Sequence, residues 1–448
     1  MRQASFLRVV VGIAIPVGLQ SMLQSSFAMV DQLMVGQLGS AAVAAVEVAS
    51  RPAFIYSVVV GAAASAAGIM VSQYLGMGDD EMADRSLSVN LAAVTVLAGV
   101  FMAVCLLFPE QIVRIFVIDD PAVLPPGKSY LLRIAWTYLP SGIASILSVM
   151  IRCMGRAVLP LGAGAAAAAV NTLLNYALIF GRLGFPALGV DGAAIASVVS
   201  QMVNLLLILA MFFRLKAERH SGLHFSLALG AAGWRQFIWM LLPILINEFF
   251  WSLGQNVNTC IYGHIGTGAL AAMSMTGPIQ GLFIGAMGGV SQAAGILVGK
   301  RLGAREYDAA YQESKKLMLY GLAGSLMLSP ALVLLKNPYV LLYNVEPAVQ
   351  ETASLLLSVF ALLAPVKVAN MILGGGIVRS GGKTGYVLAI ELAGTWLVGA
   401  PLGLVAAFVF RLPIQWVYFI LSQEELVRLL LTALFFRSRK WMANLSKH

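Results

Sequence analysis

Asp31 is a lone carboxylate inside a long apolar run, and it is the residue of this sequence with the clearest capacity for chemistry. The run begins near Leu7 and continues to about Val35, which is long enough to cross a membrane. An ionisable group at that depth is costly and usually faces a cavity or a partner. Burial favours the neutral carboxyl, so Asp31 can carry a proton, and with oxygen ligands nearby it can instead hold Na⁺. The structural alternative is that Asp31 caps a helix end or bonds to backbone.

Three neutral polar residues are candidates to share a cavity with Asp31. Asn171 and Asn175 are four residues apart in one apolar run, which places them on one face of a helix. Ser197 lies near the start of the next run. These side chains would supply oxygens and hydrogen-bond donors to an ion site. The alternative is that they only bond helix to helix, which is common in membranes.

A second group of polar and aromatic residues lies in the latter half of the chain. Ionisable groups within apolar runs are expected to face a cavity or one another. The candidates for a substrate contact or a second ion site are Glu248, Asn247, Trp251, Lys367, Asn370 and Glu391.

Pairing lowers the cost of burying charge, so Lys367 is expected to pair with Glu248 or Glu391. The alternative is that such a pair is static and has no role in function. Two further groups at helical spacing are expected to pair internally: Glu47 with Arg51, and Glu424 and Glu425 with Arg428. The alternative for the second group is that it faces the interface between the lobes.

Pro16 and Pro243 lie inside long apolar runs at equivalent positions of a repeat described below. Proline removes a helix hydrogen bond and permits a kink. We expect both positions to act as hinges, and the alternative is a fixed bend.

The composition indicates what kind of elements must position these residues. Hydrophobic residues make up 59% of 448 positions and charged residues 11%, and the mean hydropathy is +0.86. A soluble domain has about 25% charged residues, so lipid is the solvent that fits. The predicted class is an all-α polytopic membrane protein with twelve transmembrane helices. The apolar runs are 7–35, 43–75, 88–108, 129–151, 158–180, 190–213, 236–263, 269–298, 317–335, 353–378, 385–409 and 413–436.

An internal repeat relates the two halves of the chain. A shift of 227 positions superimposes prolines, arginines and spaced glycines over most of one half. Matching pairs include Pro16 with Pro243, Gly36 with Gly263, Gly39 with Gly266, Arg152 with Arg379, Gly155 with Gly382, Arg156 with Lys383 and Pro186 with Pro413. With six helices in each repeat, the two lobes are related by an axis along the membrane normal.

The charges set the domain boundaries and the orientation. We expect an N-terminal lobe at 1–213, a cytoplasmic linker at 214–235, and a C-terminal lobe at 236–448 with a short basic tail. About 20 of the 29 basic residues fall in segments on one side of the membrane. The positive-inside rule therefore predicts a multi-pass protein of the plasma (inner) membrane with both termini cytoplasmic.

Several functional classes are excluded or disfavoured. The net charge is +9, but the basic residues cluster in the short segments between apolar runs, where the positive-inside rule places them. Nucleic acid is therefore not an expected partner. The three cysteines and four histidines are scattered, without the spacing of a metal site. No nucleophile, zinc or phosphate-loop signature occurs. We therefore expect no enzyme and no cofactor. The repeat completes a two-lobed unit in one chain, so a monomer suffices.

Taken together, these residues resemble the multidrug and toxic compound extrusion (MATE) family over nearly the whole chain. The segment from Pro16 through Asp31 to Gly39 resembles that family's first-helix signature, and the segment from Pro243 to Gly266 echoes it. Residues 379–384 and 186–196 resemble its motifs after the tenth helix and before the sixth.

The resemblance implies an H⁺- or Na⁺-coupled antiporter that exports amphipathic, often cationic, organic compounds through a cavity between two six-helix lobes. It implies that Asp31 and Asn171 belong to the coupling site. Asn175 stands where several members have Asp, and Ser197 where several have Thr. Glu248 is an approximate match to an acid of the second lobe, and Lys367 departs from the family's pattern.

Two other functions remain open from the sequence. One is a flippase for lipid or lipid-linked oligosaccharide from the same superfamily, disfavoured by the scarcity of cations within the spans. The other is a membrane receptor or scaffold without transport activity.

If the protein is an exporter that works by alternating access, the coupling ion must bind its two conformations with different affinity.

Overall fold

The computed structural model describes residues 3–116, 122–218, 230–343 and 345–445, and within these ranges the chain forms helices and no strands. The predicted all-α class is therefore confirmed. The helices of the first half are α1 (Gln3–Gly36), α2 (Ser40–Ala49), α3 (Arg51–Met77), α4 (Asp80–Leu107), α5 (Pro109–Arg114), α6 (Leu124–Ile134), η1 (Ala135–Thr137), α7 (Tyr138–Cys153), α8 (Val158–Phe180) and α9 (Val190–Glu218).

The second half contains longer α-helices interrupted by π-helical turns. Its elements are α10 (Gly230–Ile265), α11 (Thr267–Gly303), α12 (Tyr307–Val340), α13 (Pro347–Asn370), η2 (Met371–Val378), α14 (Thr384–Leu392), η3 (Ala393–Gly399), α15 (Ala400–Leu404), η4 (Val405–Val409), α16 (Ile414–Leu421) and α17 (Glu424–Arg437). The segments η2, η3 and η4 are π-helical.

Eleven helices in the described ranges are long and apolar enough to cross a membrane. They coincide with the first eleven predicted runs. The twelfth, at 413–436, is divided between α16 and α17 by a turn at Ser422 and Gln423. Each of these two helices alone is shorter than a bilayer crossing.

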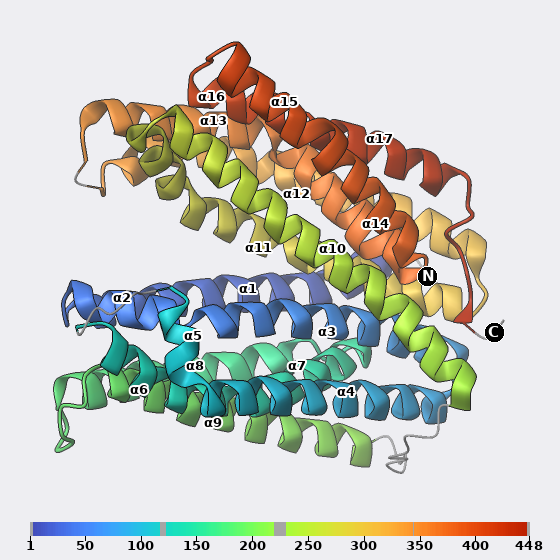
Figure 1. Ribbon diagram of the computed structural model, residues 1–448. Helices are drawn as coiled ribbons and strands as arrows, with labels where there is room; N and C mark the ends of the chain where they lie inside the picture. Colours follow the sequence, from blue (N-terminus) through green and yellow to red (C-terminus); the bar gives the residue numbers. More distant parts are fainter. Residues whose placement is uncertain (1–2, 117–121, 219–229, 344, 446–448) are drawn as a thin grey trace. The chain divides into compact units, whose positions relative to one another are not determined.

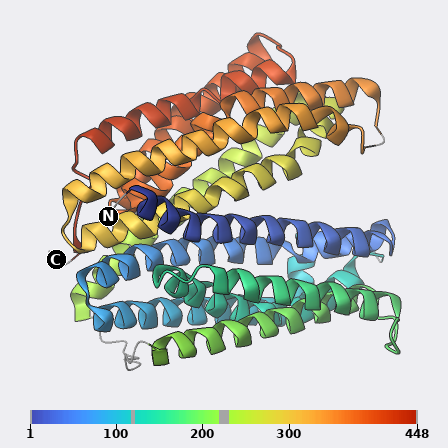
Figure 2. The same cartoon turned by 180° about the vertical axis from the view of Figure 1, so that it is seen from behind.

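The chain forms two compact units, each described here by itself. One unit consists of residues 22–71 and 79–231, and the other of residues 1–21, 72–78 and 232–448. In the first unit α8 packs along α9, and α7 packs against both α4 and α9. Figures 1 and 2 show these helices side by side with similar axis directions. In the second unit α11 packs against α12, α13 and η2. The predicted boundaries of lobes and linker stay a prediction, and residues 219–229 of the linker lie outside the described residues.

Local chemistry explains several helix ends. The Asp79 side chain accepts a hydrogen bond from the Met82 amide at 2.9 Å, which caps the start of α4. Gly181 ends α8 with φ +65°, in the left-handed region that favours glycine. Pro16 and Pro243 lie inside α1 and α10, which continue through them. Their predicted role as hinges stays a prediction.

Lys216 forms a buried ion pair with Asp84, and both side chains are only 4% exposed. The pair joins the last turn of α9 to the first part of α4. Because Lys216 lies in a charged stretch, the sequence placed it in the loop-like linker. The structure instead places it in α9, where its aliphatic stem extends the apolar face and its ammonium group meets a buried carboxylate.

Candidate functional site

The structure brings Asp31 into contact with the α8 asparagines. Asn175 donates a hydrogen bond from Nδ2 to Asp31 Oδ1 at 2.6 Å. The same amide nitrogen lies 3.1 Å from Asn171 Oδ1. Both asparagines are buried, and their spacing of one helical turn places them on the face that meets α1. Asp31, Asn171 and Asn175 therefore lie together, as the sequence predicts.

The amide of Asn171 fits two orientations that correspond to two states of Asp31. With the oxygen toward the carboxylate, the contact requires a proton on Asp31, which then donates to Asn171. With the amide turned over, Asn171 Nδ2 lies 2.6 Å from Asp31 Oδ1 and 3.2 Å from Oδ2 and donates to the ionised carboxylate. Such orientations are assigned from hydrogen-bond partners, and the turned-over amide gives the ionised carboxylate a donor but places Asn171 Nδ2 3.1 Å from the Asn175 amide nitrogen.

Two serine hydroxyls of α9 complete this group. Asn171 Nδ2 lies 3.5 Å from Ser197 Oγ and 3.5 Å from Ser200 Oγ, and Ser200 Oγ donates to the Ser197 carbonyl at 2.9 Å. Sequence reasoning named Ser197 but missed Ser200. Its spacing of three residues from Ser197, on the same helical face, was the available signal. We call these five residues the Asp31 site: Asp31, Asn171, Asn175, Ser197 and Ser200.

One oxygen of the Asp31 site is left without a protein partner. Asn175 Oδ1 is buried and makes no hydrogen bond within the described residues. Unpaired buried acceptors are uncommon in folded proteins. Carboxylate, amide and hydroxyl oxygens are the donors that a hard cation such as Na⁺ prefers, although the Asn175 amide turns its nitrogen, not this oxygen, toward Asp31.

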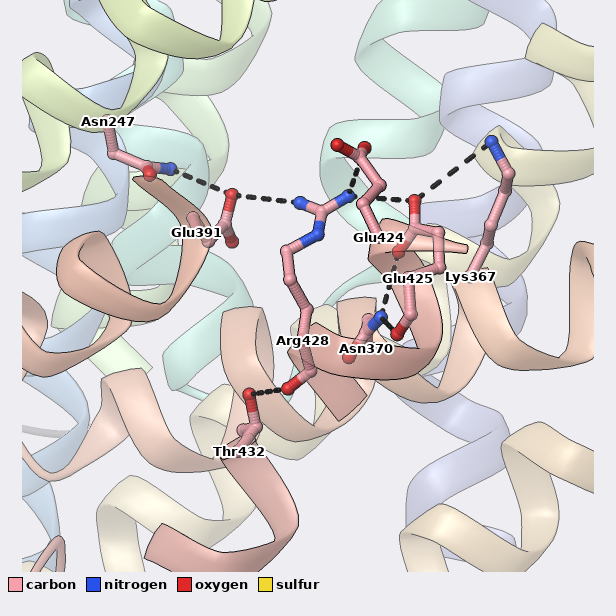
Figure 3. Close-up of polar contacts among 8 residues, drawn as sticks. All are labelled: Asn247, Lys367, Asn370, Glu391, Glu424, Glu425, Arg428 and Thr432. Atoms are coloured by element: carbon pink, nitrogen blue, oxygen red, sulfur yellow. Dashed lines mark hydrogen bonds and ion pairs between the residues drawn. The ribbon is translucent and has the colours of Figure 1, made fainter. Parts of the chain in front are cut away.

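The second polar group surrounds Arg428 in α17. Its guanidinium contacts Glu425 at 2.8 Å, Glu424 at 3.1 Å and Glu391 of α14 at 3.4 Å, as Figure 3 shows. The Arg428 side chain is only 12% exposed. The predicted pairing of Glu424 and Glu425 with Arg428 is confirmed, whereas the contact with Glu391 requires two helices to meet and was missed.

The predicted pairing of Lys367 with Glu248 or Glu391 is wrong. Lys367 Nζ instead lies 4.0 Å from Glu425, because Glu391 of α14 points to Arg428 (Figure 3). The Lys367 ammonium also lies 5.5 Å from the centre of the Tyr418 ring, a cation–π distance. Asn370 Nδ2 donates to Glu425 Oε2 at 2.8 Å and to its carbonyl at 2.7 Å. We call the Arg428 cluster the residues Lys367, Asn370, Glu391, Glu424, Glu425 and Arg428.

The remaining second-half candidates lie along α10. Asn247 Nδ2 donates to Glu391 Oε2 at 3.4 Å, which connects α10 to the Arg428 cluster. Trp251 and Glu391 line a recess of about 10 Å³, which is room for about one water molecule. Glu248 forms no ion pair within the described part of the chain. Asn247, Trp251 and Glu391 therefore lie together, whereas Lys367 and Asn370 contact Glu425.

One further expected pair is present. Glu47 and Arg51 form the expected pair at 2.8 Å, with both side chains more than half exposed. Within the ranges that the structure describes, no three His, Cys, Asp or Glu side chains gather as a metal centre would require.

The MatE family model matches the chain twice, over residues 16–177 and 243–405. The two matches begin 227 positions apart, which confirms the repeat and its offset. Together they cover well over half of the chain.

Named relatives match over most of their length. The chain is 24% identical to the uncharacterized transporter YisQ of Bacillus subtilis, with 92% of this chain and 90% of that protein covered. It is also 24% identical to the probable multidrug resistance protein NorM of Thermotoga maritima, with 96% and 92% covered. The multidrug resistance protein MdtK of Edwardsiella ictaluri is 24% identical, with 89% and 87% covered.

Solved structures show the same fold. The crystal structure of the Vibrio cholerae MATE transporter VcmN in the bent form has a TM-score of 0.87 to this chain, with 18% identity and 98% and 99% of the chains covered. A crystal structure of a MATE protein in the straight conformation has a TM-score of 0.84 and 18% identity over the full length of both chains. The predicted fold of two six-helix lobes is confirmed.

Proposed function

Because the chain belongs to the MatE family of secondary transporters, we propose that it exports amphipathic organic cations in exchange for H⁺ or Na⁺, with the ion bound at Asp31. The protein is a multi-pass integral membrane protein and not an enzyme. The names of NorM and MdtK support a multidrug substrate range. The excess of basic residues in one set of loops supports cytoplasmic termini.

The observation that carries this proposal is the composition of the Asp31 site. One carboxylate is surrounded by neutral amides and hydroxyls, so no fixed cation compensates its charge within the site. Binding of H⁺ or Na⁺ at Asp31 then changes the net charge of the site by one unit. The turned-over Asn171 amide gives the ionised carboxylate a donor, and the free Asn175 oxygen supports Na⁺ as an alternative to the proton.

The coupling follows from differential binding. An ion can shift the equilibrium between two conformations only by as much as its affinity for them differs. Asp31 lies in α1, whereas its partners lie in α8 and α9. A movement of α1 relative to α8 would change the contacts of the carboxylate and hence its affinity for the ion. Pro16, in the same helix, is a candidate position for that bend.

Transport in reconstituted liposomes tests the proposal. A proton gradient and, separately, a Na⁺ gradient are imposed while flux of a fluorescent organic cation is recorded. Wild type is compared with Asp31→Asn and with the control Glu47→Gln, which changes an exposed acid outside the site. We expect flux to follow one of the gradients, to fall to the level of empty liposomes in Asp31→Asn, and to persist in Glu47→Gln.

Two outcomes would contradict the proposal. Unchanged gradient-driven flux in Asp31→Asn would remove Asp31 from coupling and move attention to Glu248 or Glu391. No flux with either gradient, in protein shown to be folded, would count against cation export. Flipping of a labelled lipid by the same liposomes would then support the flippase function.

A further inference from the structure

A cavity of about 830 Å³ opens between α10, the start of α14 and the last described residues of the chain. All of its lining belongs to one compact unit. It is far larger than the recess beside Glu391, and neither the Asp31 site nor the Arg428 cluster contributes a residue to it. The transport proposal therefore does not account for this cavity.

The charge of the lining is positive. Arg235 of α10 and Lys383 before α14 line the cavity, and its lining includes no acidic residue. Neither cation forms an ion pair with a carboxylate within the described ranges. Two unneutralised basic groups on one cavity wall attract an anion.

The first turn of α14 adds hydrogen-bond donors to this wall. Lys383 stands at the N-cap position without a capping side chain. The Tyr386 amide donates to the Lys383 carbonyl at 3.2 Å, which leaves the amides of Thr384 and Gly385 as the donors at the start of α14 that a cap does not cover. Thr384 lines the cavity and is only 3% exposed, and its hydroxyl has no hydrogen-bond partner. A helix N-terminus with a free hydroxyl and a lysine matches the needs of a phosphate group.

The turn before α14 is held in a fixed form. Gly382 has φ +74°, which favours glycine. A side chain at Gly381 would collide with the Trp441 carbonyl. Gln73 donates to the Ser380 carbonyl at 2.8 Å and accepts from the Leu445 amide at 3.0 Å, which joins this turn to the C-terminal wall of the cavity. The donors are thus positioned before any ligand arrives.

The other walls are apolar and aromatic. Trp239 and Tyr386 line the cavity and are 68% and 56% exposed, and Pro243 and Ala389 continue the apolar surface. Trp and Tyr concentrate where a membrane meets water. A ligand that fills this cavity therefore needs an anionic end for the basic wall and an apolar part for the aromatic wall.

We propose that this cavity binds the phosphate group of an anionic phospholipid from the predicted cytoplasmic leaflet. The phosphate accepts hydrogen bonds from Thr384 and the first amides of α14 and is neutralised by Lys383 and Arg235. The acyl chains lie along Trp239 and Pro243. Basic pockets between helices on the cytoplasmic side are a recurring form of lipid headgroup site. A soluble phosphate ester offers the same phosphate chemistry without the apolar part.

The internal repeat supplies a matched control. The 227-residue shift places Arg156 and Ala157 opposite Lys383 and Thr384. Arg156 is exposed and Ala157 has no hydroxyl, so the equivalent turn keeps the positive charge without the threonine. Arg156→Gln removes the same kind of charge from a turn that does not line this cavity.

Lipid binding to purified, delipidated protein in a neutral detergent tests the inference. Native mass spectrometry gives the Kd for phosphatidylglycerol and for phosphatidylcholine, whose choline cancels the phosphate charge. We expect phosphatidylglycerol to bind wild type at least about tenfold more tightly than phosphatidylcholine. The double variant Lys383→Gln/Thr384→Val should lose that preference, and Arg156→Gln should keep it. Arg235→Gln, at an exposed position, provides a second variant if the double variant does not fold.

A competition arm separates the two phosphate sources. Glycerol 3-phosphate at millimolar concentration should not displace phosphatidylglycerol, because it lacks the apolar part. Displacement that depends on Lys383 would overturn the lipid assignment and indicate a soluble ester. Equal binding of both lipids, or an unchanged preference in the double variant and in Arg235→Gln, would overturn the inference. Because the readout is binding, its failure is independent of any failure of cation transport.

Discussion

Asp31 and Arg428 are both ionisable side chains inside apolar helices, yet their surroundings differ in kind. Asp31 is contacted by amides and hydroxyls from α8 and α9. Arg428 is contacted by three carboxylates, and Lys367 lies within 4.0 Å of one of them. The first group leaves one charge for an external ion to alter. In the second group three carboxylates share two cations, so its formal charge is also −1, but every carboxylate has a cationic partner, which suits a fixed contact among α13, α14 and α17.

Burial of a charged side chain therefore does not by itself identify a coupling site. A coupling group must bind and release its ion during each transport cycle, so its neighbours must accommodate both its ion-bound and its ion-free form. In the Arg428 cluster every carboxylate already contacts a cation, so an ion that bound or left there would have to replace an existing ion pair, which is expensive. We therefore expect the Asp31 site to control transport and the Arg428 cluster to control stability.

The largest expected effect is on the stability of the Arg428 cluster. Arg428→Met removes the shared partner of three carboxylates, of which Glu425 is buried and Glu391 and Glu424 are partly buried, and it should destabilise the protein by about 3–5 kcal/mol. Asp31→Asn should change stability by only about 1 kcal/mol or less, because an amide can still bond to Asn171 and Asn175. Thermal unfolding in detergent measures the Tm of both variants. A similar fall in Tm in both would show that the two regions do not differ in their contribution to stability.

The next effect concerns ion affinity. Asn175→Ala removes a hydrogen bond that stabilises ionised Asp31, together with the unpaired oxygen. If Na⁺ is the coupling ion, the half-saturating Na⁺ concentration should rise about tenfold, because an oxygen ligand is lost. If H⁺ is the coupling ion, the half-saturating proton concentration should instead fall about tenfold, because the charged carboxylate loses its donor. The measurement is flux against ion concentration in liposomes. The matched control is Asn370→Ala, which also removes a buried asparagine bonded to a carboxylate. An equal shift in that variant would place ion binding in the Arg428 cluster as well.

Lys367→Met should have a smaller effect on stability, about 1 kcal/mol or less. Its ammonium lies at the 4.0 Å limit from Glu425, and Glu425 keeps its closer contact with Arg428. Comparison of Tm with that of Arg428→Met checks the ranking. A loss as large as that of Arg428→Met would mean that Lys367 anchors the cluster.

The smallest predicted effect is that of Ser200→Ala on ion affinity. The contact of Ser200 with Asn171 is long, at 3.5 Å, and bonds of that length contribute little. We expect a change of about twofold or less in the half-saturating ion concentration. A change in half-saturating ion concentration as large as that of Asn175→Ala would indicate that the Ser200 hydroxyl is a direct ion ligand.

The fold and the Asp31 site could largely be predicted from the sequence because their signals are local or periodic. Apolar runs mark the spans, the 227-residue shift marks the duplication, and the spacing of Asn171 and Asn175 defines one helical face. Lys216 and Glu391 could not be placed in the same way. Their partners, Asp84 and Arg428, lie on other helices, so the pairing depends on which faces meet. The π-helical turns η2 and η3 also break the 3.6-residue period on which a prediction of facing residues in this region would rest.

The hydrogen bonds of Gln73 can form only late in synthesis, because its partners lie far downstream in the chain. Gln73 is made early, but its partners Ser380, Ala443 and Leu445 follow 307 to 372 residues later. At about 5–20 residues per second, roughly 15 to 75 s pass before the ribosome reaches them. The buried Trp441 and Asn444 belong to the same final segment. Within its compact unit Gln73 therefore lacks these partners until residues 443–445 have been made, and a chain that stops before residue 443 would leave them missing.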